Sequence, residues 1–187
     1  MAFENPPYKV VERDGHFEIR QYGDYIVAEV TVEGDFNEAL SRGFRILADY
    51  IFGNNIRSEH IAMTVPVTEK RHSESEKIAM TAPVTSEPHG AGAYLVAFMM
   101  PSKYTLEGLP RPANERITFR TVGAHRAAAV RFSGSMDTRE AAKRRAELLE
   151  WLAARGIETP VPILYANYSP PWIPPFLRRN EILADLS

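Results

Sequence analysis

Apolar and polar side chains alternate through the stretch FEIRQYGDYIVAEVTVEG, residues 17–34. β-Branched and aromatic residues fall on one parity and charged residues on the other, which is the period of half-buried β-strands. Gly23-Asp24 interrupts this alternation and is typical of a tight turn. The sequence therefore predicts two strands that pair with each other.

The period changes in the next stretch, residues 35–54, where apolar residues recur at steps of three and four. This spacing places them on one stripe of a helix. Asp35 and Glu38 form a capping box at its start, and Gly53-Asn54 is a stop signal at its end. The stripe consists of Phe36, Leu40, Phe44, Leu47 and Ile51.

The same succession returns a hundred residues later, where TFRTVGAHRAAAVRFSG aligns without a gap with EIRQYGDYIVAEVTVEG. A second helix follows, with Asp137 and Glu140 as its capping box and Gly156 as its stop. Further extended sequence comes after each helix. The predicted core stripe of the second helix consists of Ala141, Leu148, Leu149 and Leu152.

Two similar β-β-α units predict an α+β fold with pseudo-twofold symmetry. We expect a curved antiparallel sheet of about eight strands, curled or closed into a distorted β-barrel, with two helices against it. A chain of 187 residues suits one domain, residues 1–187. Its repeat halves would span about 17–101 and about 117–186.

An eight-residue phrase occurs twice at an offset of 17 residues, in HIAMTVPVTEK and in KIAMTAPVTSE. A hairpin of two amphipathic strands at the rim of the core is one interpretation. Pro66 and Pro83 cannot donate to a strand ladder, so each would mark an edge, a bulge or a strand end. The functional alternative is that Met63 and Met80 line a pocket, because a flexible thioether adapts to flat apolar ligands.

A second unusual stretch, YSPPWIPPFLRRNE, covers residues 168–181. Its two Pro-Pro pairs favour an extended chain that covers a surface and does not join a sheet. One interpretation is a lid over one end of the barrel, with Arg178 and Arg179 solvated or ion-paired. The other is an aromatic wall of Trp172 and Phe176 beside two cations, suited to a flat apolar ligand that carries carboxylates.

Composition narrows the function classes. The 44% hydrophobic and 25% charged content is ordinary for a soluble globular protein, and the net charge of −2 gives no reason to expect a nucleic-acid partner. The absence of cysteine excludes disulfides, thiolate metal sites and a cysteine nucleophile. No apolar run is long enough for a signal peptide or a membrane span, so we expect a cytoplasmic protein.

The five histidines give no metal motif, and no structural metal is expected. His60 alone stands beside an apolar strand, which makes it a weak candidate metal ligand. The sequence contains no nucleophile elbow, P-loop or dinucleotide fingerprint, and no catalytic residue is assigned.

The segments FEIRQY, GFRILADYIFG, IAMTAPVT, FMMPSKYTLEGLPRP, RFSG and PPWIPPFLRRNE together resemble the SOUL haem-binding family, in order and over nearly the whole chain. The resemblance implies a distorted barrel of two β-α-β-β repeats. It also implies non-covalent binding of haem or free porphyrin in a shallow apolar cleft, without a shared axial ligand. Gln21 stands where some members carry a histidine, so iron ligation by that route is lost.

The resemblance and the residue patterns together give the candidate tetrapyrrole-binding residues. They are apolar or aromatic side chains of the first helix, the doubled phrase and the proline-rich stretch, with arginines as partners for the propionates. The set consists of Leu40, Phe44, Leu47, Ala48, Met63, Met80, Tyr168, Trp172, Phe176, Arg42, Arg45, Arg178 and Arg179.

A tetrapyrrole carrier, buffer or sensor is the preferred function. One alternative is a hydrolase or other enzyme for a hydrophobic small molecule, with Glu29, Glu107 or Glu181 as a carboxylate of raised pKa. Another is a module that binds a protein through its aromatic residues. The sequence leaves enzymatic activity and the oligomeric state open, with a slight preference for a non-enzyme and for a monomer.

Overall fold

The computed structural model describes residues 3–57, 75–158, 163–170 and 172–186. It contains two long helices, α1 (Phe36–Ile51) and α2 (Thr138–Ala153), and a short 3-10 helix, η1 (Pro175–Leu177). The strands are β1 (Tyr8–Asp14), β2 (Phe17–Tyr22), β3 (Tyr25–Glu33), β4 (Asn55–Ile56), β5 (Val84–Pro88), β6 (Ala93–Met99), β7 (Arg111–Pro112), β8 (Thr118–Val122), β9 (His125–Phe132), β10 (Ile163–Asn167) and β11 (Asn180–Asp185).

Both long helices begin where the capping residues predict. The carboxylate of Asp35 accepts a hydrogen bond from the backbone N–H of Glu38, and Asp137 does the same for Glu140. Each cap satisfies a backbone donor that has no partner within its helix. After each helix a glycine adopts positive φ, +125° at Gly53 and +68° at Gly156, which lets the chain leave the helix.

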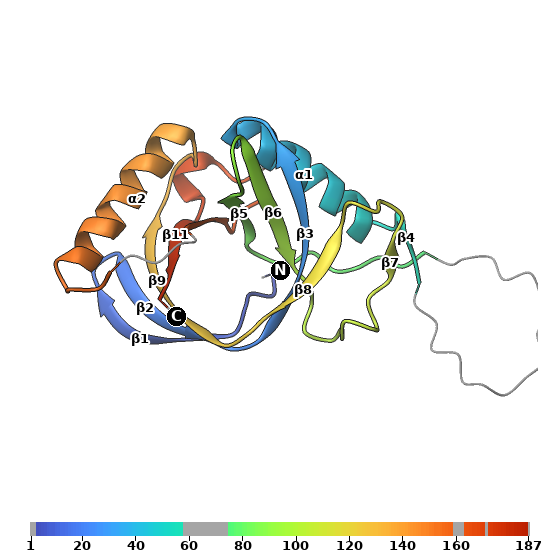
Figure 1. The fold of residues 1–187 in the computed structure, drawn as a ribbon, viewed down its shortest axis with the longest axis horizontal. Helices are drawn as coiled ribbons and strands as arrows, with labels where there is room; N and C mark the ends of the chain where they lie inside the picture. Colours follow the sequence, from blue (N-terminus) through green and yellow to red (C-terminus); the bar gives the residue numbers. More distant parts are fainter. Residues whose placement is uncertain (1–2, 58–74, 159–162, 171, 187) are drawn as a thin grey trace, which may run out of the picture.

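Nine strands form one curled antiparallel sheet in the order β1-β2-β9-β11-β10-β5-β6-β3-β8, and β4 pairs separately with β7. Figure 1 shows the sheet wrapped into a half-barrel with α1 and α2 on its outer side. The predicted α+β class is therefore confirmed. The two edge strands of the sheet, β1 and β8, do not pair with each other among the described residues, so the barrel is incomplete.

The predicted hairpins are wrong, because each strand of a unit pairs with the other unit. β2 pairs with β9 and β3 pairs with β8. The register is continuous across the breaks: Tyr22 lies opposite His125, and Tyr25 lies opposite Val122. Residues 17–29 and 118–130 are thus two bent segments that lie antiparallel in one register, which is the arrangement that a twofold axis between equivalent segments produces.

The second copy of the doubled phrase forms a strand only in its last part. β5 begins at Val84, directly after Pro83, as expected for a residue that cannot donate to a ladder. β5 is bounded by β6 on one side and β10 on the other, so no edge of it remains for a hairpin with the first copy. The first copy lies outside the described residues.

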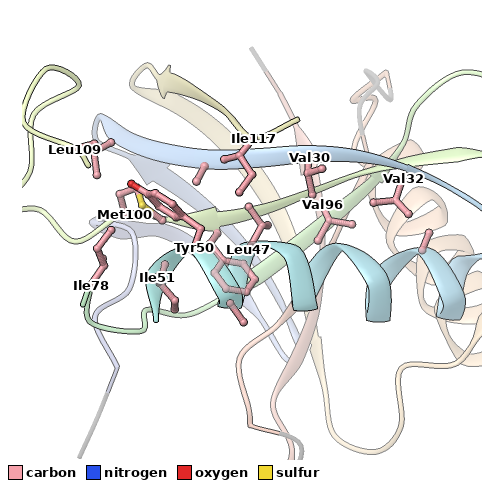
Figure 2. Packing of buried hydrophobic residues seen from close by; sticks show 14 residues of the cluster. Val30, Val32, Leu47, Tyr50, Ile51, Ile78, Val96, Met100, Leu109 and Ile117 are labelled. Atoms are coloured by element: carbon pink, nitrogen blue, oxygen red, sulfur yellow. The ribbon is translucent and has the colours of Figure 1, made fainter. Parts of the chain in front are cut away.

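The apolar core has two main clusters, one under each helix. In the first, Leu47 of α1 points toward Val30 of β3 and Val96 of β6 (Figure 2). In the second, Leu148 and Leu152 of α2 pack with residues of β2, β9 and β11. Leu40 packs against both clusters and lies where α1 approaches the other half of the molecule.

Candidate functional site

A cleft of about 620 Å³ lies between α1 and the proline-rich stretch, which we call the strap (residues 168–179). Its other walls are the segment around Met80, the end of β10 and the loop that leads into α2. This volume falls within the ~300–1,000 Å³ of typical small-molecule sites. Seven of the predicted residues line it: Leu40, Phe44, Arg45, Met80, Tyr168, Trp172 and Arg178.

The wall on α1 consists of side chains one helical turn apart. Leu40 and Phe44 are only partly buried, whereas Phe36 and Leu47 of the same stripe are in the core. The ring of Phe44 packs against that of Phe98, with the centroids 5.4 Å apart and the planes tilted by 58°. The core therefore fixes Phe44 from one side while the cleft borders it on another.

The opposite wall contains Tyr168, at the base of the strap. The guanidinium of Arg179 stacks 4.0 Å from the centroid of its ring. Burial and the neighbouring Glu181 carboxylate raise the pKa of Tyr168 well above its ordinary value, so its hydroxyl stays protonated at neutral pH. Tyr168 thus contributes a rigid, uncharged aromatic surface.

The strap is held by backbone contacts. The N–H of Gly134 donates to the carbonyl of Pro175 at 3.0 Å, and the N–H of Tyr168 donates to that of Arg179 at 3.1 Å. Trp172 is 74% exposed and lines the cleft, whereas Phe176 is 73% exposed and does not line it. The two aromatic residues of the strap therefore have different positions relative to the site.

Two arginines border the cleft. The Nε of Arg45 donates to the backbone carbonyl of Ser41 at 3.3 Å, and the Nε of Arg178 donates to that of Ile173 at 2.8 Å. These contacts hold both guanidinium groups beside the apolar walls. Such groups bind carboxylates through paired hydrogen bonds.

Arg179 belongs to a buried ion network. It donates from Nη2 to Glu181 at 2.8 Å and to the hydroxyl of Tyr8 at 3.2 Å. Arg20 forms a bidentate ion pair with the same carboxylate: its Nη1 donates to Oε2 at 2.7 Å and its Nη2 donates to Oε1 at 2.8 Å. Burial alone would raise the pKa of Glu181, but the two arginines outweigh it and lower that pKa.

A model of the family described as SOUL heme-binding protein matches residues 3–185. The chain belongs to the SOUL heme-binding protein family. It is similar to heme-binding protein 2 of Homo sapiens, with 39% identity over 72 residues. That match covers 36% of this chain and 35% of the human protein.

Three solved structures share the SOUL chain's fold at low sequence identity. The C-terminal domain of EcmrR has a TM-score of 0.63 at 14% identity, over 96% of this chain and 98% of that one. A protein from Listeria innocua titled as a hydrolase has a TM-score of 0.59 at 11% identity, over 95% and 94%. SAV2435 bound to tetraphenylphosphonium has a TM-score of 0.50 at 9% identity, over 91% and 93%.

The other predicted residues that the structure describes lie outside the cleft. Leu47 and Ala48 are buried in the first core cluster. Arg42 donates to the backbone carbonyl of Glu33 at 3.1 Å and, like Phe176 and Arg179, does not line the cleft. His60 and Met63 lie outside the described residues.

Sequence reasoning missed the polar side of the cleft. Asn37, Ser135, Asn167 and Asn180 line it together with Asp137, the N-cap of α2. The Nδ2 of Asn180 donates to the carbonyl of Gly134 at 2.8 Å, which ties β11 to the loop before α2. Only the capping signal at Asp137 was visible in the sequence, because isolated polar residues from different elements form no sequence pattern.

The three glutamates considered for catalysis do not line the cleft. Glu181 has a lowered pKa, the opposite of what a general base at neutral pH needs. Glu29 is paired with Arg120 at 3.0 Å. Among the described residues, no group of three or more His, Asp or Glu side chains could hold a metal ion, and no described helix is long and apolar enough to cross a membrane.

Proposed function

We propose that this chain binds haem or a related tetrapyrrole non-covalently in the cleft between α1 and the strap, as a carrier, buffer or sensor. The observation that carries the proposal is the combination of an apolar wall with a cationic border. Leu40, Phe44 and Trp172 give the cleft an apolar lining that suits a flat ring, and Arg45 and Arg178 line the same cleft with cations that suit its carboxylates. Membership of the SOUL heme-binding family supports the same ligand class.

The residues present fit the ring better than they fit iron. No histidine lines the cleft in the described part of the chain, and the only sulfur donors there are the thioethers of Met80 and Met136. Haem would supply a flat apolar surface and two carboxylates. The chain would bury the apolar surface and pair the carboxylates with its cationic side chains. We therefore expect affinity to come from ring burial, with iron-free protoporphyrin binding within about tenfold of haem.

Titration of the purified chain with haem and with protoporphyrin IX tests the proposal. The expected result is a saturable one-to-one spectral change with a Kd of roughly micromolar or tighter. Phe44→Ala and Trp172→Ala should each raise the Kd by about tenfold, since each removes ring contact. Phe176→Ala is the matched control, because it removes an aromatic side chain of the same strap that does not line the cleft.

The proposal fails if binding does not saturate below about 50 μM, because non-specific adsorption dominates above that concentration. It also fails if Phe176→Ala weakens binding as much as Phe44→Ala does. Thermal melts of the three variants separate lost binding from lost folding.

A further inference from the structure

One polar group among the residues that line the cleft has no hydrogen-bond partner in the described part of the chain. The Nδ2 of Asn167 is buried and makes no hydrogen bond to any described residue. Asn167 is the last residue of β10, lies opposite Asn180 of β11, and lines the cleft. A buried amide donor without a partner destabilises the protein, and such groups in native structures call for an explanation.

The neighbouring polar groups are already used within the protein. The Nδ2 of Asn180 donates to Gly134, the hydroxyl of Ser169 accepts from the N–H of Arg179 at 2.9 Å, and Asp137 caps α2. Asn167 is different, because its amide nitrogen serves no structural contact. The torsion about the Cβ–Cγ bond of asparagine has a broad, roughly twofold profile, so the amide can turn its N–H groups toward the cleft at small cost.

We propose that Asn167 is a specificity-determining residue that donates a hydrogen bond to a carboxylate of the bound ligand. This inference rests on the proposed function and narrows its ligand class to tetrapyrroles with free acid side chains. The ligand's apolar ring lies against Phe44 and Trp172, and one carboxylate reaches the floor of the cleft, where Asn167 provides a donor. A neutral ester of the same ring loses the charge-assisted part of this contact.

Two ligands and two variants test the inference. Protoporphyrin IX and its dimethyl ester share the ring and differ in the charge of the side chains. Asn167→Asp replaces the donor with a carboxylate of nearly the same shape. It should raise the Kd for the diacid by about tenfold or more and the Kd for the ester by less than about threefold. Asn37→Asp is the matched control, since it adds the same charge at an exposed position of the same cleft, where solvent screens it.

The outcomes separate this inference from the proposed function. Suppose that wild-type protein binds both porphyrins. If Asn167→Asp then weakens the binding of both by the same factor, or leaves both affinities unchanged, the inference is overturned and the proposed function stands. If wild-type protein binds neither, both fall. If Asn167→Asp does not fold, Asn167→Leu is tested in the same way, because it also removes the Nδ2 donor, which makes no hydrogen bond within the described protein. It should weaken diacid binding more than ester binding, and equal changes would overturn the inference.

Discussion

Glu181 is the residue on which the ion network at the base of the strap depends. It is fully buried and accepts hydrogen bonds from Arg20 and Arg179, and Arg20 is itself only 1% exposed. Glu181→Gln would remove the carboxylate that the two guanidinium groups share, and Arg20 would keep only its pair with Glu18, at 2.7 Å. We expect it to lower the free energy of unfolding by about 3–5 kcal/mol, measured by urea denaturation at pH 7.

The control is Glu29→Gln, which breaks a pair with a partner, Arg120, that is 52% exposed, and it should change stability by less than about 1 kcal/mol. The pH dependence gives a second check. The folded-state pKa of Glu181 lies below its ordinary value of 4.5, so its stabilisation is complete above that value and disappears as the pH falls through the folded-state pKa. Acidification should therefore destabilise wild type more than Glu181→Gln, and parallel curves would contradict this account.

At the level of elements, Gly43 sets how closely α1 approaches the sheet. A Cβ added there would lie 2.6 Å from the Cβ and Cγ2 of Val96 on β6. Helix propensity alone favours alanine over glycine by about 1 kcal/mol, but overpacking costs about 1–3 kcal/mol, so the clash decides the sign. We expect Gly43→Ala to destabilise the protein in urea denaturation.

A double-mutant cycle with Val96→Gly checks the cause, because glycine removes both the Cβ and the Cγ atoms that the added Cβ would meet. If the clash is responsible, Gly43→Ala should destabilise the Val96→Gly background less than it destabilises wild type. Gly123→Ala is the control, because no atom lies within 4 Å of its added Cβ and its φ is not positive. Equal effects in the two backgrounds would show that the close approach of α1 to β6 is not the cause.

The sequence predicted the helices better than the strand partners. Capping residues and an apolar stripe are local signals, and they placed α1 and α2 directly after Asp35 and Asp137. Alternation identifies a strand but carries no information about its partner. Gly23 therefore suggested a hairpin, although the segment continues through it to pair with the other unit.

The same distinction applies to the cleft. Phe44 and Trp172 were predictable because they belong to a helical stripe and to a proline-rich motif. Leu47 belongs to the same stripe but faces the core, and the stripe alone cannot tell these two environments apart. No sequence signal marks Asn167, because the pairing of β10 with β11 is what brings it to the cleft.

In the molecule as a whole, each of the two main core clusters takes residues from both predicted repeat halves. The cluster under α1 includes Ile117, which comes from the second half, and the cluster under α2 includes Ile19 and Phe36 from the first. Together with the exchanged segments, this arrangement predicts that neither half unfolds alone. Loss of packing under α1 should therefore be detected by a probe under α2.

Leu47→Ala tests this coupling, because Leu47 is fully buried under α1. The probe is Trp151 in the cluster under α2. The chain has two tryptophans, so a Trp172→Phe background leaves Trp151 as the single source of tryptophan fluorescence. The substitution should lower the free energy of unfolding by about 2–5 kcal/mol. The urea midpoints from Trp151 fluorescence and from far-UV circular dichroism should fall together, as they should for Leu148→Ala under α2. If the Trp151 midpoint stays at its wild-type value while the dichroism midpoint falls, the halves unfold independently, although strands of one half pair with strands of the other.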